Sequence, residues 1–197
     1  MRLFLVRHAS PRVDPHTDPA SWPLSARGRE EARALAGIAA RRGIEAIYTS
    51  SERKAADTAL AIAATTGVPL WQAAGLEELR VAGWVANADA FNELVRAIFA
   101  DPGASVRAAE SAAAAVRRFG GVIDALVSKH QTAVVVSHGR ILSAWLAAAG
   151  AVDDAFSVWR AMPLPAWAEV DIDARTITLA QPFAGVPLPS HARTHCR

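Results

Sequence analysis

The hydropathy pattern of this chain contains two uninterrupted apolar runs that lead into a histidine. Residues 3–6 run directly into Arg7 and His8, and residues 133–136 run into His138 after one serine. Neither run alternates with polar residues, which is typical of strands that are buried on both faces in the middle of a parallel sheet. Because such sheets bind their ligands at the carboxyl ends of the strands, we expect the two histidines to face one pocket.

The adjacency of Arg7 and His8 restricts where the first strand can end. Neighbouring residues within a strand point to opposite faces of the sheet, so a pair inside the strand could not grip one small ligand. The two side chains can therefore converge only where the strand has already ended.

The rest of the pattern alternates between helix-like and strand-like segments. Apolar spacing and capping residues predict helices over residues 25–42, 49–66 (cap residues included), 88–100, 108–129 and 140–149. Further strands are predicted over residues 44–48, 68–72, 132–137, 166–172 and 176–180. This alternation indicates an α/β protein, and the prolines after residue 181 predict an irregular tail over residues 182–197.

The composition fits one enzyme-sized domain and argues against nucleic acid. With 197 residues, of which 52 % are hydrophobic, the chain can bury a full core, and its length favours a single domain over residues 1–197. The formal charge is only +2, from 21 basic and 19 acidic side chains. Such a small excess does not indicate the basic face that nucleic-acid binding needs.

No segment of the sequence indicates export or a membrane span. Residues 3–6 are too few for the apolar region of a signal peptide, and no apolar run approaches the roughly 20 residues that cross a bilayer. The single cysteine, Cys196, lies next to the last residue, which excludes an internal disulfide framework and a cysteine-rich zinc site. We therefore expect a cytoplasmic protein with no membrane partner.

Acidic and histidine side chains alternate in the loop over residues 9–24. Asp14, His16 and Asp18 could suggest a metal site, but no partner ligands at suitable spacing occur elsewhere. A solvated turn is the favoured interpretation, and we expect no metal and no other cofactor. Trp22 in the same loop either lines a substrate pocket or merely packs.

Taken together, these residues resemble the motifs of the histidine phosphatase superfamily, also called the phosphoglycerate mutase-like family. The resemblance covers residues 3 to about 150 and rests on elements in the expected order. These elements are Arg7-His8, Pro23-Leu24-Ser25 with Gly28, Tyr48-Thr49-Ser50 before a basic residue and Thr58-Ala59, Leu76-Glu77-Glu78, and Ser137-His138-Gly139. The resemblance implies a three-layer α/β sandwich with a mostly parallel central sheet flanked by helices, in which residues 79–107 form a small cap.

The resemblance also implies catalytic roles for the two histidines. His8 would be the nucleophile that attacks a phosphomonoester and forms a phosphohistidine, which water then hydrolyses. An imidazole attacks through an unprotonated nitrogen, so its other nitrogen should be fixed by a hydrogen bond, often to a backbone carbonyl. Arg7 would hold two phosphoryl oxygens with its guanidinium fork. His138 would donate from the opposite side, preferably as the cation.

The second phosphate-binding cation has two candidates. The family usually places an arginine four residues before the threonine of the second helix, and here that position is Lys54, with Arg53 one step earlier. Neighbouring helix positions differ in direction by about 100°, so one of the two is expected to reach the phosphate. Arg53 is preferred because a guanidinium matches the oxygens better, whereas Lys54 would bind as a point charge. The unused one, together with Glu52, would belong to a solvated first turn.

Glu78 is the candidate general acid that protonates the leaving oxygen. In the family this residue is the glutamate of a Leu-x-Glu element, often with a tryptophan six residues later. Leu76 and Trp84 stand at these offsets from Glu78, whereas Glu77 satisfies neither offset. Trp84 is, like Trp22, a candidate for the substrate pocket.

These assignments predict a metal-independent hydrolase of a small phosphate ester, with a phosphohistidine on His8. A phosphoglycerate mutase-type phosphotransferase is the nearest alternative, although residues 79–107 are a modest insertion for a mutase. A protein phosphohistidine phosphatase is a further alternative, as is a catalytically inactive module that binds phosphorylated ligands. The presence of Arg7, His8, Glu78 and His138 argues against the inactive module, whereas Lys54 and the altered loop after Glu78 keep it as an alternative. A homodimer is compatible with the sequence.

Overall fold

A six-stranded sheet in the order β3-β2-β4-β1-β5-β6 forms the centre of the computed structural model. The model describes residues 1–83, 85, 87–107, 110–173 and 176–187. The strands are β1 (Arg2–Arg7), β2 (Ala46–Thr49), β3 (Leu70–Gln72), β4 (Thr132–Ser137), β5 (Ala166–Ile172) and β6 (Ile177–Gly185). Strands β3, β2, β4 and β1 are parallel to one another, whereas β5 runs antiparallel to β1 and β6 runs antiparallel to β5.

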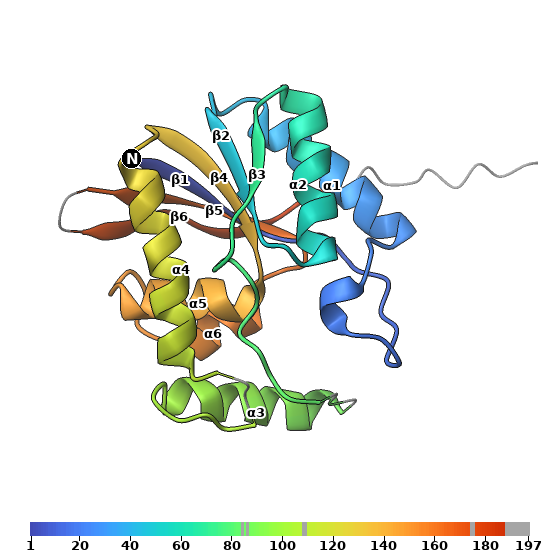
Figure 1. Cartoon of the computed structure of the whole chain (residues 1–197), viewed down its shortest axis with the longest axis vertical. Coiled ribbons are helices and arrows are strands. Elements are labelled where there is room, and N and C mark those ends of the chain that lie inside the picture. Colours follow the sequence, from blue (N-terminus) through green and yellow to red (C-terminus); the bar gives the residue numbers. More distant parts are fainter. Residues whose placement is uncertain (84, 86, 108–109, 174–175, 188–197) are drawn as a thin grey trace, which may run out of the picture.

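Helices cover both faces of this sheet. They are α1 (Ala26–Ala39), α2 (Arg53–Thr66), α3 (Ala88–Ala100), α4 (Ala112–Val127), α5 (Gly139–Ala148) and α6 (Ala155–Ala161), with a short 3-10 helix η1 (Pro19–Ser21). Figure 1 shows α1 and α2 on one side of the sheet and α4, α5 and α6 on the other, with α3 beyond α5 and α6. The predicted three-layer α/β fold with a mostly parallel sheet is confirmed.

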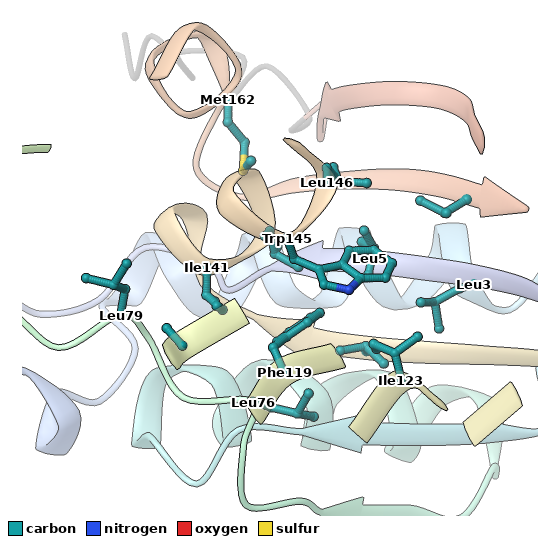
Figure 2. Close-up of a cluster of buried hydrophobic side chains, with 14 of the residues drawn as sticks. Leu3, Leu5, Leu76, Leu79, Phe119, Ile123, Ile141, Trp145, Leu146 and Met162 are labelled. Carbon is teal, nitrogen blue, oxygen red and sulfur yellow. The ribbon is translucent and has the colours of Figure 1, made fainter. Parts of the chain in front are cut away.

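The side chains of β1 alternate between two apolar clusters, one on each face of the sheet. Leu3 and Leu5 belong to the cluster under α4 and α5, part of which Figure 2 shows, and both are fully buried. Phe4 and Val6 belong to the cluster under α1 and α2. The uninterrupted apolar run therefore has the predicted cause, because this central strand is covered on both faces.

The structure corrects the predicted irregular tail. Strand β6 continues to Gly185, so residues 182–185 belong to the sheet, with Ala184 and Gly185 paired with β5. Pro182 is tolerated because β6 is an edge strand and its pairing with β5 shifts register around Glu169. Residues 188–197 lie outside the described residues. Helix α6 was not predicted from the pattern, since it is only seven residues long.

The predicted cap over residues 79–107 contains α3, whose bounds match the predicted helix over residues 88–100. The division of the chain into one domain with a small cap stays a prediction. None of the helices in the described ranges has the length and apolar character that a membrane span requires.

Candidate active site

The two predicted histidines lie next to each other at the carboxyl ends of neighbouring strands. Strands β1 and β4 pair in parallel with Arg7 opposite Ser137, so the chain leaves both strands at the same level. The ring centroids of His8 and His138 are 5.1 Å apart, and the ring planes make an angle of 62°. His138 is fully buried, whereas His8 keeps 7 % of its surface exposed. Strand register thus joins residues that are far apart in the sequence.

His8 occupies the turn that follows β1, and one of its nitrogens is fixed by the main chain. Nδ1 lies 2.8 Å from the carbonyl oxygen of Ala9. A carbonyl only accepts, so Nδ1 carries a proton, and in the neutral ring that the lowered pKa of His8 favours, Nε2 is unprotonated. Thr58 supports the same turn, because its hydroxyl accepts the Ala9 N–H at 3.0 Å. Burial lowers the pKa of His8 well below its usual value of 6.5, and the neighbouring ring of His138 and the charge of Lys54 lower it further.

Arg7, the last residue of β1, is anchored by main-chain carbonyls and keeps one nitrogen free of partners. Its Nη1 donates to the carbonyl oxygens of Met162 at 2.7 Å and Pro163 at 3.3 Å. Its Nε is buried and has no partner among the described residues. Gly139 permits this approach, since a Cβ there would lie 3.1 Å from Nε. A buried donor without an acceptor costs free energy, which an anion bound here would relieve.

His138 is held by a side chain from another element. Its Nε2 lies 2.9 Å from the hydroxyl of Ser50, and its Nδ1 is buried without a partner in the described part of the chain. Burial lowers the pKa of His138 to about 3, although the carboxylate of Glu78 opposes this shift. His138 is therefore neutral near pH 7 in this structure, and the expected cationic form is not what its surroundings favour.

The structure turns Lys54, and not Arg53, toward the histidines. Lys54 is 7 % exposed, and its Nζ donates to the carbonyl of Pro19 at 2.8 Å and to Glu52 Oε2 at 2.5 Å. The charge of Lys54 lowers the pKa of both histidines. The Arg53 side chain is 63 % exposed and lies 3.7 Å from Asp57 on the surface of α2. The sequence preference for Arg53 rested on guanidinium chemistry, whereas the direction of the first turn of α2 places Lys54 inside.

Glu52 belongs to this cluster, although the sequence placed it in a solvated turn. Its side chain is 11 % exposed, and Oε1 accepts the main-chain N–H of Glu78 at 2.8 Å. The same oxygen lies 3.6 Å from His138 Nε2. The sequence signal that could have identified Glu52 was the lysine at the family's arginine position, with an acidic residue two positions before it.

Glu78 lies in the loop after β3, and its carboxylate accepts main-chain N–H groups of its own loop and of the N-terminus of α5. Oε1 accepts from Leu79 at 2.9 Å and Ile141 at 3.0 Å, and Oε2 accepts from the N–H of Arg140 at 3.2 Å. Burial alone would raise the pKa of Glu78, but the charge of Arg140, the ring of His138 and these N–H groups lower it to about 2. The carboxyl is therefore ionised at neutral pH, and it must take up a proton before it can donate one.

An arginine that the sequence did not single out holds the segment that carries Glu78. Arg118 of α4 donates to the carbonyl oxygens of Gly75 and Glu77 at 2.8 Å each, and to that of Glu78 at 2.9 Å. Glu110 fixes the guanidinium through contacts of 3.0 Å at Nε and 2.5 Å at Nη2. No local pattern connects α4 to this loop, so only the tertiary structure reveals the contact.

The remaining predicted residues are those of the loop before α1 and Trp84. The indole nitrogen of Trp22 donates to the carbonyl of Asp14 at 3.0 Å and to the Thr17 hydroxyl at 3.1 Å, so Trp22 packs within its own loop. Trp84 lies outside the described residues. Asp14 and Asp18 each accept the main-chain N–H two residues later, as solvated turns do. In the part of the chain that the structure describes, no group of three His, Cys, Asp or Glu side chains is arranged to hold a metal ion.

A family model and several solved structures match this chain. The model is that of the histidine phosphatase superfamily (branch 1), and it matches residues 3–183. A comparison with curated proteins found no match. The match to the family model spans nearly the whole sheet, including the two strand ends that carry the histidines.

The solved structures have the same fold at low sequence identity. A mycobacterial glucosyl-3-phosphoglycerate phosphatase superposes with a TM-score of 0.73 at 23 % identity, covering 91 % of this chain and 97 % of its own. A second mycobacterial protein, hydrolase 2, gives 0.79 at 22 %, covering 96 % and 93 %. The alpha-ribazole phosphatase from Shigella flexneri gives 0.69 at 21 %, covering 95 % and 99 %. At these identities the likeness establishes the fold.

Proposed function

Because the chain belongs to the histidine phosphatase superfamily, we propose that it is a metal-independent hydrolase of phosphomonoesters of small metabolites, with His8 as the nucleophile. The observation that carries this proposal is the tautomer of His8, whose Nδ1 donates to the carbonyl of Ala9 and leaves Nε2 unprotonated. A free ring nitrogen beside fixed cationic groups is what nucleophilic attack on a phosphoryl group requires.

The reaction takes two displacements at phosphorus. In the first, Nε2 of His8 forms a bond to phosphorus as the bond to the ester oxygen breaks, and the alcohol leaves with a proton. In the second, water attacks phosphorus, the bond to nitrogen breaks, and inorganic phosphate leaves. The hydrogen bond to Ala9 keeps Nδ1 protonated throughout, so the ring returns to its starting tautomer.

Three protein groups can stabilise the charge on the transferring phosphoryl group. Arg7 Nε and His138 Nδ1 are buried nitrogens without partners in the described ranges. Lys54 has three donors, of which Pro19 and Glu52 take two. The charge of phosphoryl transfer spreads over three equatorial oxygens, and one donor from each group would serve them.

Glu78 would act as the general acid after it takes up a proton from the substrate. Its pKa of about 2 keeps it ionised in the free protein. A phosphomonoester has a second pKa of about 6, so its monoanion brings one proton into the site. Glu78 would accept this proton as it leaves the N–H groups of α5, and would then pass it to the leaving oxygen. We therefore expect kcat/KM to fall as the pH rises above about 6, where the monoanion is lost.

The substrate class is proposed from the names of the relatives. One is a phosphatase of glucosyl-3-phosphoglycerate and another is an alpha-ribazole phosphatase. The mycobacterial phosphatase has also been solved with inorganic phosphate and with VO3. A phosphate ester of a small sugar-like or carboxylate-bearing metabolite is the corresponding proposal for this chain.

The test is hydrolysis of p-nitrophenyl phosphate in the presence of a chelator, with the reaction quenched in alkali so that a phosphohistidine survives. We expect chelator-resistant turnover and a phosphoryl adduct on the peptide that contains His8, and then activity on members of a panel of sugar phosphates.

A second candidate function, a binding module without turnover, is favoured by the ionised state of Glu78. Binding of phosphate and vanadate by a folded protein that hydrolyses none of these esters would establish that candidate instead.

A further inference from the structure

We propose that Glu52 is a positioning residue, which fixes the ammonium of Lys54 and the main chain of Glu78 relative to the two histidines. The proposal rests on the proposed phosphatase function. The Glu52 carboxylate contacts groups from three separate parts of the chain: Lys54 of α2, the N–H of Glu78 in the loop after β3, and His138 after β4. A single side chain thus ties together the elements that converge at this site.

The contact between Glu52 and Lys54 depends on where α2 begins. Residues two positions apart on a helix do not face each other, so this ion pair could not form inside α2. Glu52 is the N-cap residue and is extended, with φ −66° and ψ 131°, before the helix begins at Arg53. Its side chain makes no capping hydrogen bond to its own helix. The carboxylate is therefore directed away from the usual capping role and into the cluster.

Both members of the pair are largely buried, and every oxygen of the carboxylate is used. The Lys54 and Glu52 side chains are 8 % and 11 % exposed. Oε2 accepts from Lys54 Nζ at 2.5 Å, and Oε1 accepts from the Glu78 N–H at 2.8 Å. A buried ion pair of this kind costs desolvation free energy and is weak evidence for a role in stability. Positioning explains its place beside the histidines better.

A lysine at this position needs an anchor that an arginine would not need. Arginine offers a planar, rigid fork, whereas the ammonium of lysine is a point charge on a flexible four-carbon stem. Glu52 and the carbonyl of Pro19 accept from two of the three N–H donors of Nζ, so the orientation of the third N–H is fixed. The anchor also carries a negative charge, which opposes binding of a phosphate anion. Glu52 should therefore favour the transition state at the expense of ground-state affinity.

The matched variants are Glu52→Gln, Glu52→Leu and the double variant Glu52→Leu/Lys54→Arg. In Glu52→Gln we expect kcat on p-nitrophenyl phosphate to fall about tenfold, because a loosely held group costs rate even when it is present. Inhibition by vanadate, which imitates the five-coordinate transition state, should weaken by a similar factor of about ten. Inhibition by inorganic phosphate should be unchanged or tighter, because a repelling charge is gone.

The double variant separates positioning from a structural role. Glu52→Leu should be slower than Glu52→Gln, and adding Lys54→Arg should restore kcat to within about threefold of wild type, because the guanidinium fork needs no anchor. Glu45→Gln is the control, since Glu45 precedes β2 at the opposite end of the sheet with a side chain 47 % exposed. We expect all variants to fold, with melting curves that confirm it.

Two results would overturn the proposal. One is a parallel weakening of phosphate and vanadate in Glu52→Gln, and the other is a double variant as slow as Glu52→Leu. Failure of the proposed function looks different, because wild type itself would then show no turnover. In that case the affinities of Glu52→Gln for phosphate and vanadate, measured by calorimetry, would still decide the role of Glu52.

Discussion

The two histidines have matching positions in the fold and different partners. Each follows the end of a buried parallel strand, and their rings lie 5.1 Å apart. His8 is fixed by the carbonyl of Ala9 in its own turn, a group that can only accept a hydrogen bond. His138 is fixed by the hydroxyl of Ser50 from another strand end, a group that can donate or accept. One ring has a single tautomer, and the other can change its protonation state.

The two rings also differ in a charged neighbour, because the carboxylate of Glu78 acts on the pKa of His138. Apart from burial, the pKa of His8 is lowered by the neighbouring ring of His138 and by the cations Lys54 and Arg7. Burial lowers the pKa of His138 to about 3; the carboxylate of Glu78 opposes this shift, whereas the charges of Lys54 and Arg140 add to it. The comparison teaches that a nucleophile needs a fixed, neutral ring, whereas a phosphate-binding donor needs a ring that can gain a proton when an anion arrives.

The largest expected effect comes from removing each ring in turn. His8→Ala should abolish turnover and the phosphoenzyme, because no other nucleophile is present in the mechanism. His138→Ala should lower kcat by about 10² to 10³, the usual cost of losing one preorganised donor, and should still form the phosphoenzyme. Stopped assays with p-nitrophenyl phosphate and peptide mapping measure both quantities. Equal losses in the two variants would mean that the assignment of separate roles is wrong.

The next effect concerns the cation that influences both rings. Lys54→Ala should lower kcat/KM by about 10², because its charge acts on both histidines. Arg53→Ala is the matched control on the neighbouring position, and its exposed side chain should make the change smaller than about twofold. Steady-state kinetics on both variants measures the difference. A larger loss in Arg53→Ala would restore the assignment that the sequence favoured.

The elements that the sequence predicted well are those governed by local pattern. The strand over residues 132–137 and the helix over residues 88–100 match β4 and α3 residue for residue. The pairing of His8 with His138 was also predictable, because strand register and the rule for parallel sheets bring two strand ends together. None of these predictions needed knowledge of a side-chain direction.

The parts that the sequence did not predict depend on backbone angles and distant contacts. Whether Arg53 or Lys54 faces inward is decided by where α2 starts, and that follows from the extended backbone of Glu52. The contacts of Arg118 with the Glu78 loop join residues about 40 positions apart without any shared motif. The edge position of β6, which makes Pro182 acceptable, is likewise a property of the assembled sheet.

A smaller effect should come from the hydroxyl that holds His138. Ser50→Ala removes the partner of Nε2 and should lower kcat about tenfold, since a lost hydrogen bond costs about 1 to 1.5 kcal/mol. Ser143→Ala is the control, because the Ser143 hydroxyl is buried on α5 and has no partner among the described residues. It should leave kcat unchanged and should not lower the melting temperature. If Ser50→Ala is as active as the control, the hydroxyl does not orient the ring.

The smallest effect is on stability, and there the two histidines should behave alike. Both rings are buried and neutral with lowered pKa values, about 3 for His138 against an ordinary value of 6.5. Between these values the unfolded chain binds more protons than the folded one, so the free energy of unfolding must fall as the pH falls below about 6.5. Each ring contributes a slope of at most about 1.4 kcal/mol per pH unit. Urea unfolding between pH 5 and 7 should show a flatter pH dependence in both His8→Gln and His138→Gln.

The measurement must stay above pH 5 because Glu78 also makes stability depend on pH. Its pKa is lowered from an ordinary value of 4.5 to about 2, so its own contribution to stability is lost only as the pH falls below about 4.5. An unchanged slope in either variant would mean that this ring binds as many protons in the folded protein as in the unfolded chain, so that its pKa is not lowered by folding.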